Sequence, residues 1–218
     1  MIESKPWNWE LVDKNDAFWN NAAPEMYFLA EDWAKKCFKN ILDVGCGYGR
    51  NSVFLAAKGF NMSGFDLSQR SVETTKENGK KYGFNFDNFV VADMLKFPYE
   101  DNQFDALIAM NVISHTDKEG FNQILHEIKR VLKLGGEAYF TLGSKESFWF
   151  TNPECIYVDE NTRIRVEDGP ENGIPHFYID DDDCKTLFKE FKIIKIKEVR
   201  ELTEYGTFSP HYHIWIAR

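Results

Sequence analysis

Residues 41–51, Ile-Leu-Asp-Val-Gly-Cys-Gly-Tyr-Gly-Arg-Asn, combine an aspartate with three glycines at alternate positions. Glycine lets the backbone adopt positive φ and lets a ligand approach closely, and a helix N-terminus after such a turn presents free N–H groups. These residue types at this spacing predict a site for a nucleoside-bearing cofactor. The contacts predicted within this stretch are Asp43, Gly45, Cys46, Gly47, Gly49 and Asn51.

A second carboxylate, Asp66, ends the apolar segment 61–66. It follows the glycines by about 20 residues, which is where a ribose diol is bound when a strand, a helix and a second strand form a βαβ unit. Residues 41–44 are the first predicted strand, and 52–59 are the predicted helix. Leu67 follows directly and is also predicted to contact the cofactor.

The glycine spacing separates two classes of cofactor. A dinucleotide site has Gly-x-Gly-x-x-Gly, whereas this chain has Gly-x-Gly-x-Gly. With Asp43 two positions before the first glycine, the stretch resembles motif I of the class I S-adenosylmethionine-dependent methyltransferases. The resemblance implies that Asp66 holds the ribose hydroxyls of S-adenosylmethionine. It also implies that Asp93 and its neighbour Met94, after the apolar segment 89–91, lie at the adenine.

The resemblance continues along the chain. Residues 104–115 resemble the fourth strand and motif IV of the family, which places Asn111 at the cofactor as well. Residues 128–136 resemble its Arg-Val-Leu-Lys-Pro-Gly-Gly passage, with Leu134 in place of the proline. The resemblance is strong over residues 38–143 and looser elsewhere. It implies a doubly wound α/β fold, with a mostly parallel seven-stranded sheet, helices on both faces and a last, antiparallel strand beside the sixth.

Two histidines are the candidate catalytic residues. His115 follows the motif IV strand, where this family commonly places groups next to the departing methyl group. His176 lies in Gly-Ile-Pro-His-Phe-Tyr, residues 173–178, which resembles a passage of small-molecule methyltransferases of the tellurite-resistance type. Ordinary hydrogen bonding within a loop is the alternative role for each histidine.

No residue is predicted to bind a metal ion. The four cysteines include no Cys-x-x-Cys pair, so reduced thiols are expected, and Cys46 is expected to pack beneath the glycine loop. The four aspartates 180–183 are typical of a helix N-cap and first turn rather than of a cation site. His211 and His213 face the same side of a predicted strand, and without a third ligand nearby a structural role is favoured over zinc binding.

The remaining elements follow from hydrophobic spacing. Residues 118–132 carry apolar side chains at i, i+3, i+4 and i+7, which predicts a helix packed on a sheet. Residues 143–179 form a long connection that leaves the carboxyl end of the fifth strand. Because ligands bind at that rim, this excursion is expected to contact the substrate. Further helices are expected over 68–82 and 180–191, and strands over 138–141, 157–158, 163–166, 192–200 and 210–217.

Residues 1–37 carry four of the six tryptophans and are predicted to be an aromatic-rich, helical extension of a methyltransferase domain over 38–218. The extension either packs at the sheet edge or closes as a lid over the carboxyl ends of the strands and excludes water. As a lid it would enclose, together with the excursion 143–179, a small acceptor that is uncharged, cationic or soft, because aromatic faces attract such groups. The aromatic residues expected to enclose it are Trp19, Phe148, Trp149, Tyr157 and Phe177.

Composition limits the partners. The 218 residues carry a formal net charge of −9, and nucleic acids are bound through an excess of Lys and Arg, so no nucleic-acid partner is expected. No apolar stretch reaches membrane-spanning length and the N-terminus lacks a signal-peptide pattern, which indicates a cytoplasmic protein without membrane contact. A monomer or a homodimer is expected.

These inferences predict transfer of the sulfonium methyl group of S-adenosylmethionine to a small molecule in one in-line displacement, with the chain supplying alignment and a dry cavity. A hydroxyl or acidic N–H acceptor would benefit from a base such as His115. Two alternatives stay open: an NAD-dependent oxidoreductase, and a non-catalytic module that binds the cofactor or regulates a partner. The glycine spacing and Asp93 argue against the first.

Overall fold

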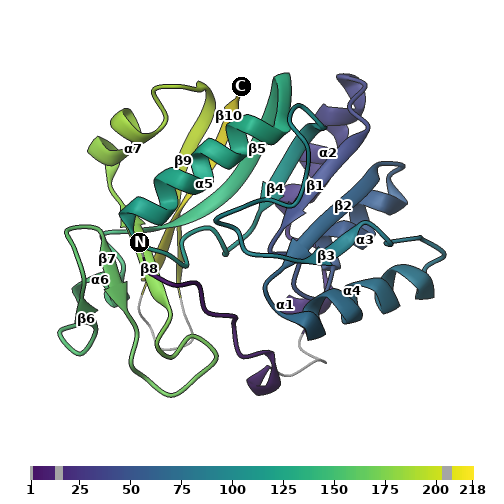
Figure 1. Cartoon of the computed structure of the whole chain (residues 1–218). Coiled ribbons are helices and arrows are strands. Elements are labelled where there is room, and N and C mark those ends of the chain that lie inside the picture. Colours follow the sequence, from purple (N-terminus) through teal and green to yellow (C-terminus); the bar gives the residue numbers. More distant parts are fainter. Residues whose placement is uncertain (1, 13–16, 203–207) are drawn as a thin grey trace.

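Seven strands form the centre of a ten-stranded sheet in the computed structural model, which describes residues 2–12, 17–202 and 208–218 (Figure 1). Five of these seven strands are parallel to one another. In spatial order they are β3 (Phe89–Val91), β2 (Asn61–Asp66), β1 (Asn40–Val44), β4 (Phe104–Ala109) and β5 (Leu132–Ser144).

The other two strands complete the sheet beyond β5. Strand β10 (Phe208–Ala217) runs antiparallel to β5 on one side and to β9 (Lys192–Leu202) on the other. The last strand is therefore inserted between the fifth and sixth strands of the sheet and runs against both. This arrangement confirms the predicted doubly wound, mostly parallel sheet with an antiparallel final strand.

Helices cover both faces of this sheet because the strands bury side chains on both sides. On one face, α5 (Lys118–Val131) and α7 (Asp181–Leu187) enclose a core that includes Phe121 and Phe140. The other face carries α2 (Glu25–Lys35), α3 (Arg50–Ala57) and α4 (Gln69–Lys81), whose buried side chains form a second core with the strands.

The helices predicted over residues 68–82 and 118–132 correspond to α4 and α5. Helix α5 begins after Asp117, whose side chain accepts a hydrogen bond from Gly120 N, and it buries the predicted apolar stripe. Helix α2 buries Met26 and Trp33 completely against the sheet. Residues 25–35 therefore pack into the second core.

The excursion 143–179 folds as a small unit beside β5. It contains α6 (Phe148–Thr151) and an antiparallel ribbon of β6 (Ile156–Tyr157), β7 (Thr162–Ile164) and β8 (Pro175–Ile179). Strand β8 joins the main sheet through parallel pairing of Tyr178 with Gly143 and of Ile179 with Ser144. The two predicted short strands are present, but β8 was not predicted. Its pairing with β5 holds the excursion against the carboxyl end of the sheet.

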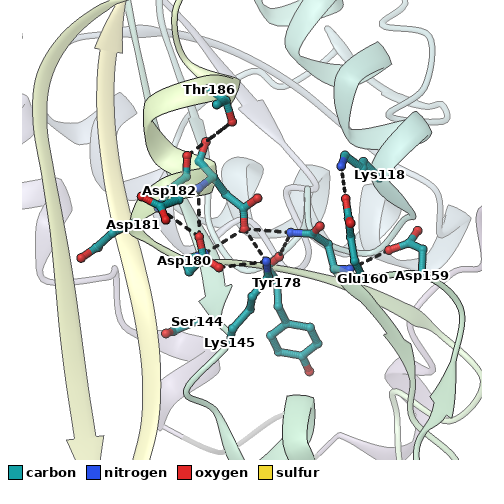
Figure 2. A network of polar contacts seen from close by, with 12 residues as sticks. Lys118, Ser144, Lys145, Asp159, Glu160, Tyr178, Asp180, Asp181, Asp182 and Thr186 are labelled. Atoms are coloured by element: carbon teal, nitrogen blue, oxygen red, sulfur yellow. Dashed lines mark hydrogen bonds and ion pairs between the residues drawn. The ribbon is translucent and has the colours of Figure 1, made fainter.

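The four consecutive aspartates cap helix α7, as predicted. Asp180 accepts hydrogen bonds from the backbone N–H groups of Asp182 and Asp183, and Asp183 accepts one from Asp180 N. Lys145 pairs with Asp180 and Asp183 at 3.0 and 2.7 Å, and Asn161 donates to Asp183 (Figure 2). Asp180 and Asp183 are therefore neutralised by a lysine and by the helix N-terminus.

The N-terminal segment crosses the carboxyl ends of the strands. It runs from beside β8 through the short 3₁₀ helix η1 (Trp9–Leu11) (Figure 1), and Trp19 of the following α1 (Ala17–Asn20) contacts the rings of Trp7 and Trp9. Met1 and residues 13–16 of the predicted extension lie outside the described residues. No helix within the described ranges is long and apolar enough to cross a bilayer.

Candidate active site

The three glycines form the turn between β1 and α3 with φ values of +66°, +54° and +80° for Gly45, Gly47 and Gly49. A Cβ on Gly45 would lie 2.3 Å from a methyl group of Val112, and one on Gly49 would lie 2.8 Å from Thr75. Two of the glycines are thus required by backbone conformation and by packing inside the protein. A Cβ on Gly47 would instead meet the ring of Trp9 at 2.9 Å, on the side of the N-terminal segment.

Asp66 lies at the end of β2, directly across from this turn. Its carboxylate accepts hydrogen bonds from Gly47 N at 3.0 Å and from Ser68 N at 2.9 Å. Burial raises the pKa of Asp66, and these backbone N–H groups partly offset the rise. Each carboxylate oxygen has a second lone pair, so Asp66 can still accept from the hydroxyls of a ligand.

Beneath the glycine turn, Asp43 is almost completely buried and accepts a hydrogen bond from Ser52 Oγ at 2.5 Å. Burial raises the pKa of this carboxyl to about 7, although the Ser52 hydrogen bond and Arg50 act in the opposite direction. The Cys46 thiol is buried beside Thr75 Oγ1 at 3.6 Å, and burial raises its pKa well above the usual range. Cys46 therefore packs beneath the loop as a neutral thiol.

Two further strand ends contribute polar groups. Asp93 Oδ1 accepts hydrogen bonds from Ser4 Oγ at 2.9 Å and from Leu95 N at 2.8 Å. Asn111, after β4, has φ of +56° and exchanges two hydrogen bonds with Thr141 Oγ1. The positive φ turns the chain sharply away from the strand, so the following residues, which include His115, reach the end of the sheet.

A single cavity of about 930 Å³ lies over the carboxyl ends of the strands. All the predicted cofactor residues line it except Gly49, and both predicted catalytic histidines line it as well. Its volume is near the upper end of the range for ligand sites, about 300 to 1,000 Å³. The cavity can therefore accommodate a nucleoside-bearing cofactor and a second, smaller ligand.

His115 and His176 come together at one end of this cavity. Their ring centroids are 4.8 Å apart, and Glu171 Oε1 lies 3.9 Å from His115 Nε2 and 3.6 Å from His176 Nε2. The other carboxylate oxygen of Glu171 pairs with Arg165, which also pairs with Glu167. These contacts form a cluster of two imidazoles and one carboxylate, with the guanidinium behind the carboxylate.

Both histidines are neutral at pH 7. Burial lowers the pKa of His176 to about 4, with Arg165 acting in the same direction. Burial also lowers the pKa of His115 well below its usual range, with His176 and Arg165 contributing. Neutral imidazoles offer lone pairs rather than positive charge, so this end of the cavity can accept a proton or coordinate a cation.

An aromatic roof closes the other end of the cavity. The rings of Trp7, Trp9 and Trp19 contact one another with centroids 4.7 to 5.3 Å apart, and Trp9 lies 4.3 Å from Tyr48 in the glycine turn. Of the five aromatic residues expected to enclose the acceptor, four line the cavity. Tyr157 does not, because it is 65% exposed on β6, where Arg163 stacks on it.

Three residues of this site were not found by the sequence analysis. Glu171 and Arg165 lie in a connection rich in charged residues, glycine and proline, and no motif distinguishes them from their neighbours. Trp9 belongs to the aromatic N-terminal segment, whose composition indicated a covering role but not a contact with Gly47. The remaining pair, His211 and His213, is separated in the structure. His211 lines the cavity, and His213 lies 2.9 Å from Tyr139 Oη and 3.5 Å from Glu25.

The strand order, the antiparallel last strand and the acidic residues at the ends of successive parallel strands define the class I methyltransferase fold. Comparisons with known proteins agree. The model of a methyltransferase-domain family matches residues 41–136. A solved S-adenosylmethionine-dependent methyltransferase from Methanosarcina mazei has a TM-score of 0.70 at 19% identity, over 91% of this chain and 98% of that one.

Two further proteins are similar over shorter parts of their lengths. TehB from Haemophilus influenzae has a TM-score of 0.64 at 17% identity, over 88% of this chain and 62% of its own. Sarcosine/dimethylglycine N-methyltransferase from Halorhodospira halochloris is 36% identical over 141 residues, which are 63% of this chain and 47% of that enzyme. The chain spans about half the length, or less, of the curated relatives it matches.

Residues 41–136 of the chain match a methyltransferase-domain family, and the fold is that of the class I S-adenosylmethionine-dependent methyltransferases. The alternative of an NAD-dependent oxidoreductase has no support in the matched family.

Proposed function

We propose that the protein transfers a methyl group from S-adenosylmethionine to a small-molecule acceptor. One observation carries the proposal. A single cavity joins the glycine turn and Asp66, which suit the nucleoside, to the cluster of His115, Glu171 and His176. Ligands at the two ends of one enclosed space are held next to each other, which is what an in-line displacement requires.

The residues at the glycine end fit the cofactor. Asp66 would accept hydrogen bonds from the ribose hydroxyls, and Asp93 with Met94 would border the adenine. No Cβ projects from Gly47, so the cofactor would approach its backbone closely once the ring of Trp9 moves aside. When bound, the cofactor supplies the electrophilic methyl group. The chain supplies alignment and a cavity from which water is excluded, and no nucleophilic side chain is needed.

The enclosure supports a small acceptor. The N-terminal segment is fixed across the opening, because Ile2 N donates to Asp117, Ser4 Oγ to Asp93, and Asn8 N to the carbonyl of Pro170. It therefore connects the cofactor side to the excursion 143–179 and acts as a lid. A polymer end would have to displace this lid. The relative from Halorhodospira halochloris, by its name, also methylates small molecules.

The charge of the cavity favours a neutral or cationic acceptor. Its described lining includes six carboxylates and three cationic side chains. Aromatic faces of the roof and of Trp149 attract cationic or polarizable groups as well. We therefore propose an amine, a thiol or another soft nucleophile as the acceptor class, and we expect anionic acceptors to be disfavoured.

Transfer of a labelled methyl group from S-adenosylmethionine to a panel of small amines, thiols and hydroxyl compounds tests this function. We expect at least one amine or thiol to be methylated by the wild-type protein, and Asp66→Ala to lose most of that activity. Binding of S-adenosylmethionine without transfer to any member of the panel would instead support the non-catalytic alternative.

A further inference from the structure

We propose that His115, Glu171 and His176 bind a divalent transition-metal ion at the acceptor end of the cavity. One ring nitrogen of each histidine and one oxygen of Glu171 lie within 4.8 Å of one another. The three residues come from different parts of the chain: the turn after β4, the loop between β7 and β8, and β8 itself. The fold, rather than local sequence, brings them together.

The distances are close to those of a coordinated ion. Bonds of about 2.0 to 2.2 Å from nitrogen and oxygen to a metal place ligand atoms about 3 to 3.5 Å apart. The Glu171 oxygen lies 3.9 Å from His115 Nε2 and 3.6 Å from His176 Nε2. The widest separation among the three ligand atoms is 4.8 Å, so closing the site around an ion requires movement of an imidazole as well as of the Glu171 side chain, by about 1 to 1.5 Å.

Hydrogen bonds behind the ligands orient two of them. His176 Nδ1 lies 3.0 Å from the carbonyl oxygen of Ile174, so Nδ1 carries the proton and Nε2 presents its lone pair to the cavity. The second oxygen of Glu171 is held by Arg165, which turns Oε1 toward the two rings. Metal ligands commonly have such outer partners, a carbonyl behind a histidine and a donor behind a carboxylate.

His176 Nε2 is a buried polar atom without a hydrogen-bond partner among the described residues, and the side chain of His176 is nine-tenths buried. A lone pair in this position faces a carboxylate oxygen, which is unfavourable unless a positive group lies between them. A metal ion between the three atoms would satisfy all of them.

The surrounding charges also favour a cation. Arg165 is the nearest positive group, and it is paired with Glu167 and Glu171. Asp168 adds a further carboxylate to the same part of the lining. The whole described lining has an excess of acidic side chains, so the potential in the cavity is negative and attracts a cation.

The ligand set indicates the class of ion. Two imidazoles and one carboxylate suit Zn²⁺, Fe²⁺ or Co²⁺ better than Mg²⁺ or Ca²⁺, which prefer oxygen ligands alone. Three protein ligands leave coordination positions open toward the cavity. The ion would hold a nitrogen, oxygen or sulfur atom of the acceptor there. This last role rests on the proposed methyl transfer, whereas binding of the ion does not.

Titration of the metal-free protein with Co²⁺ alone, followed by visible absorption and by elemental analysis after desalting, tests the site. We expect about one ion per wild-type chain. We expect Glu171→Gln and His176→Gln to weaken binding at least about 10-fold, because each removes one of three ligands. Circular dichroism and thermal unfolding identify any variant that does not fold, and the other variant then decides the result.

Matched control variants distinguish binding at the three-residue cluster from non-specific binding of cations elsewhere on the protein. Glu167→Gln removes a carboxylate that also pairs with Arg165 but lies outside the three-residue cluster, and His126→Gln removes an exposed histidine of α5. Both variants should bind Co²⁺ as the wild type does. No binding by the wild-type protein, or equal binding by His176→Gln and the wild type, would overturn the proposal.

Binding of S-adenosylmethionine is measured on the same metal-free preparations. This measurement distinguishes a failure of the metal-site proposal from a failure of the proposed function. Cofactor binding without Co²⁺ binding would overturn the metal site alone. Co²⁺ binding without cofactor binding would overturn the proposed methyl transfer and leave the metal site supported.

Discussion

The rings of His115 and His176 pack edge to face with centroids 4.8 Å apart, although one follows β4 and the other lies on β8. Pairing of β8 with the end of β5 holds the excursion 143–179 against the rim of the sheet, and Phe177 N donates to the carbonyl oxygen of Ser114, next to His115. These contacts bring the two histidines together at one end of the cavity.

Burial of neutral His176 predicts a loss of stability in acid. Its pKa is about 4 in the folded protein and about 6.5 in an unfolded chain, so the unfolded state binds a proton first as the pH falls. The stabilisation present above pH 6.5 is therefore lost as the pH falls toward 4. Between pH 7.5 and pH 5, the free energy of unfolding of the metal-free wild type should fall by about 2 kcal/mol more than that of His176→Gln. Urea unfolding at both pH values measures this difference. Equal losses in both proteins would contradict burial of a neutral imidazole.

Asp43 predicts a pH dependence of the opposite sign. Its pKa is about 7 in the folded protein and about 3.8 in an unfolded chain, so the unfolded state releases its proton first as the pH rises. The free energy of unfolding therefore falls as the pH rises from about 4 to about 7. Relative to Asp43→Asn, the wild type should become less stable by roughly 2 to 3 kcal/mol between pH 5 and pH 8. Urea unfolding at both pH values measures this difference, and a constant difference would show that Asp43 ionises normally.

The position of the N-terminal segment predicts a role both in the exchange of the cofactor and in methyl transfer. Trp9 covers Gly47 and Tyr48, and Ser4 contacts Asp93, so the segment must move when the cofactor enters or leaves. Deleting residues 1–12 should raise the dissociation rate of S-adenosylmethionine by about tenfold or more in stopped-flow measurements. Methyl transfer should fall by about 10²-fold or more, because water enters and the acceptor loses alignment.

Leu11→Ala provides the control for that deletion, since Leu11 is the exposed end of the same segment. It should leave both rates unchanged. If the truncated protein is folded and exchanges cofactor at the wild-type rate, the segment is packing at the sheet edge rather than a lid.

Local sequence predicted the parts of the site that lie at strand ends. Asp43, Asp66 and Asp93 each end or follow an apolar strand, and parallel strands bring such positions to one edge of the sheet. The parallel strands followed from the same motifs, and the antiparallel final strand followed from the resemblance to the class I methyltransferases. The order of these elements therefore determines the cofactor half of the cavity.

The end of the cavity that contains His115, Glu171 and His176 could not be predicted from local sequence in the same way. Glu171 and Arg165 lie on a connection without hydrophobic periodicity, and their positions depend on the pairing of β8 with β5. Strand β8 itself follows a glycine and begins with a proline, and its five residues are all buried, so it lacks the alternation of a half-buried strand. Contacts between distant segments decide this region, which is why the His115–Glu171–His176 cluster was not predicted.

Calorimetric titration with S-adenosylmethionine tests the central claim most directly, using the wild type, Asp66→Ala and Asp168→Ala. Asp168 is a carboxylate of the same cavity that lies on the excursion rather than at the glycine turn. We predict that the wild type and Asp168→Ala bind with similar affinity, and that Asp66→Ala binds more weakly by about 1.5 to 3 kcal/mol, because a charged acceptor of hydrogen bonds is lost. Wild-type affinity in Asp66→Ala, or no binding by the wild-type protein, would contradict the account.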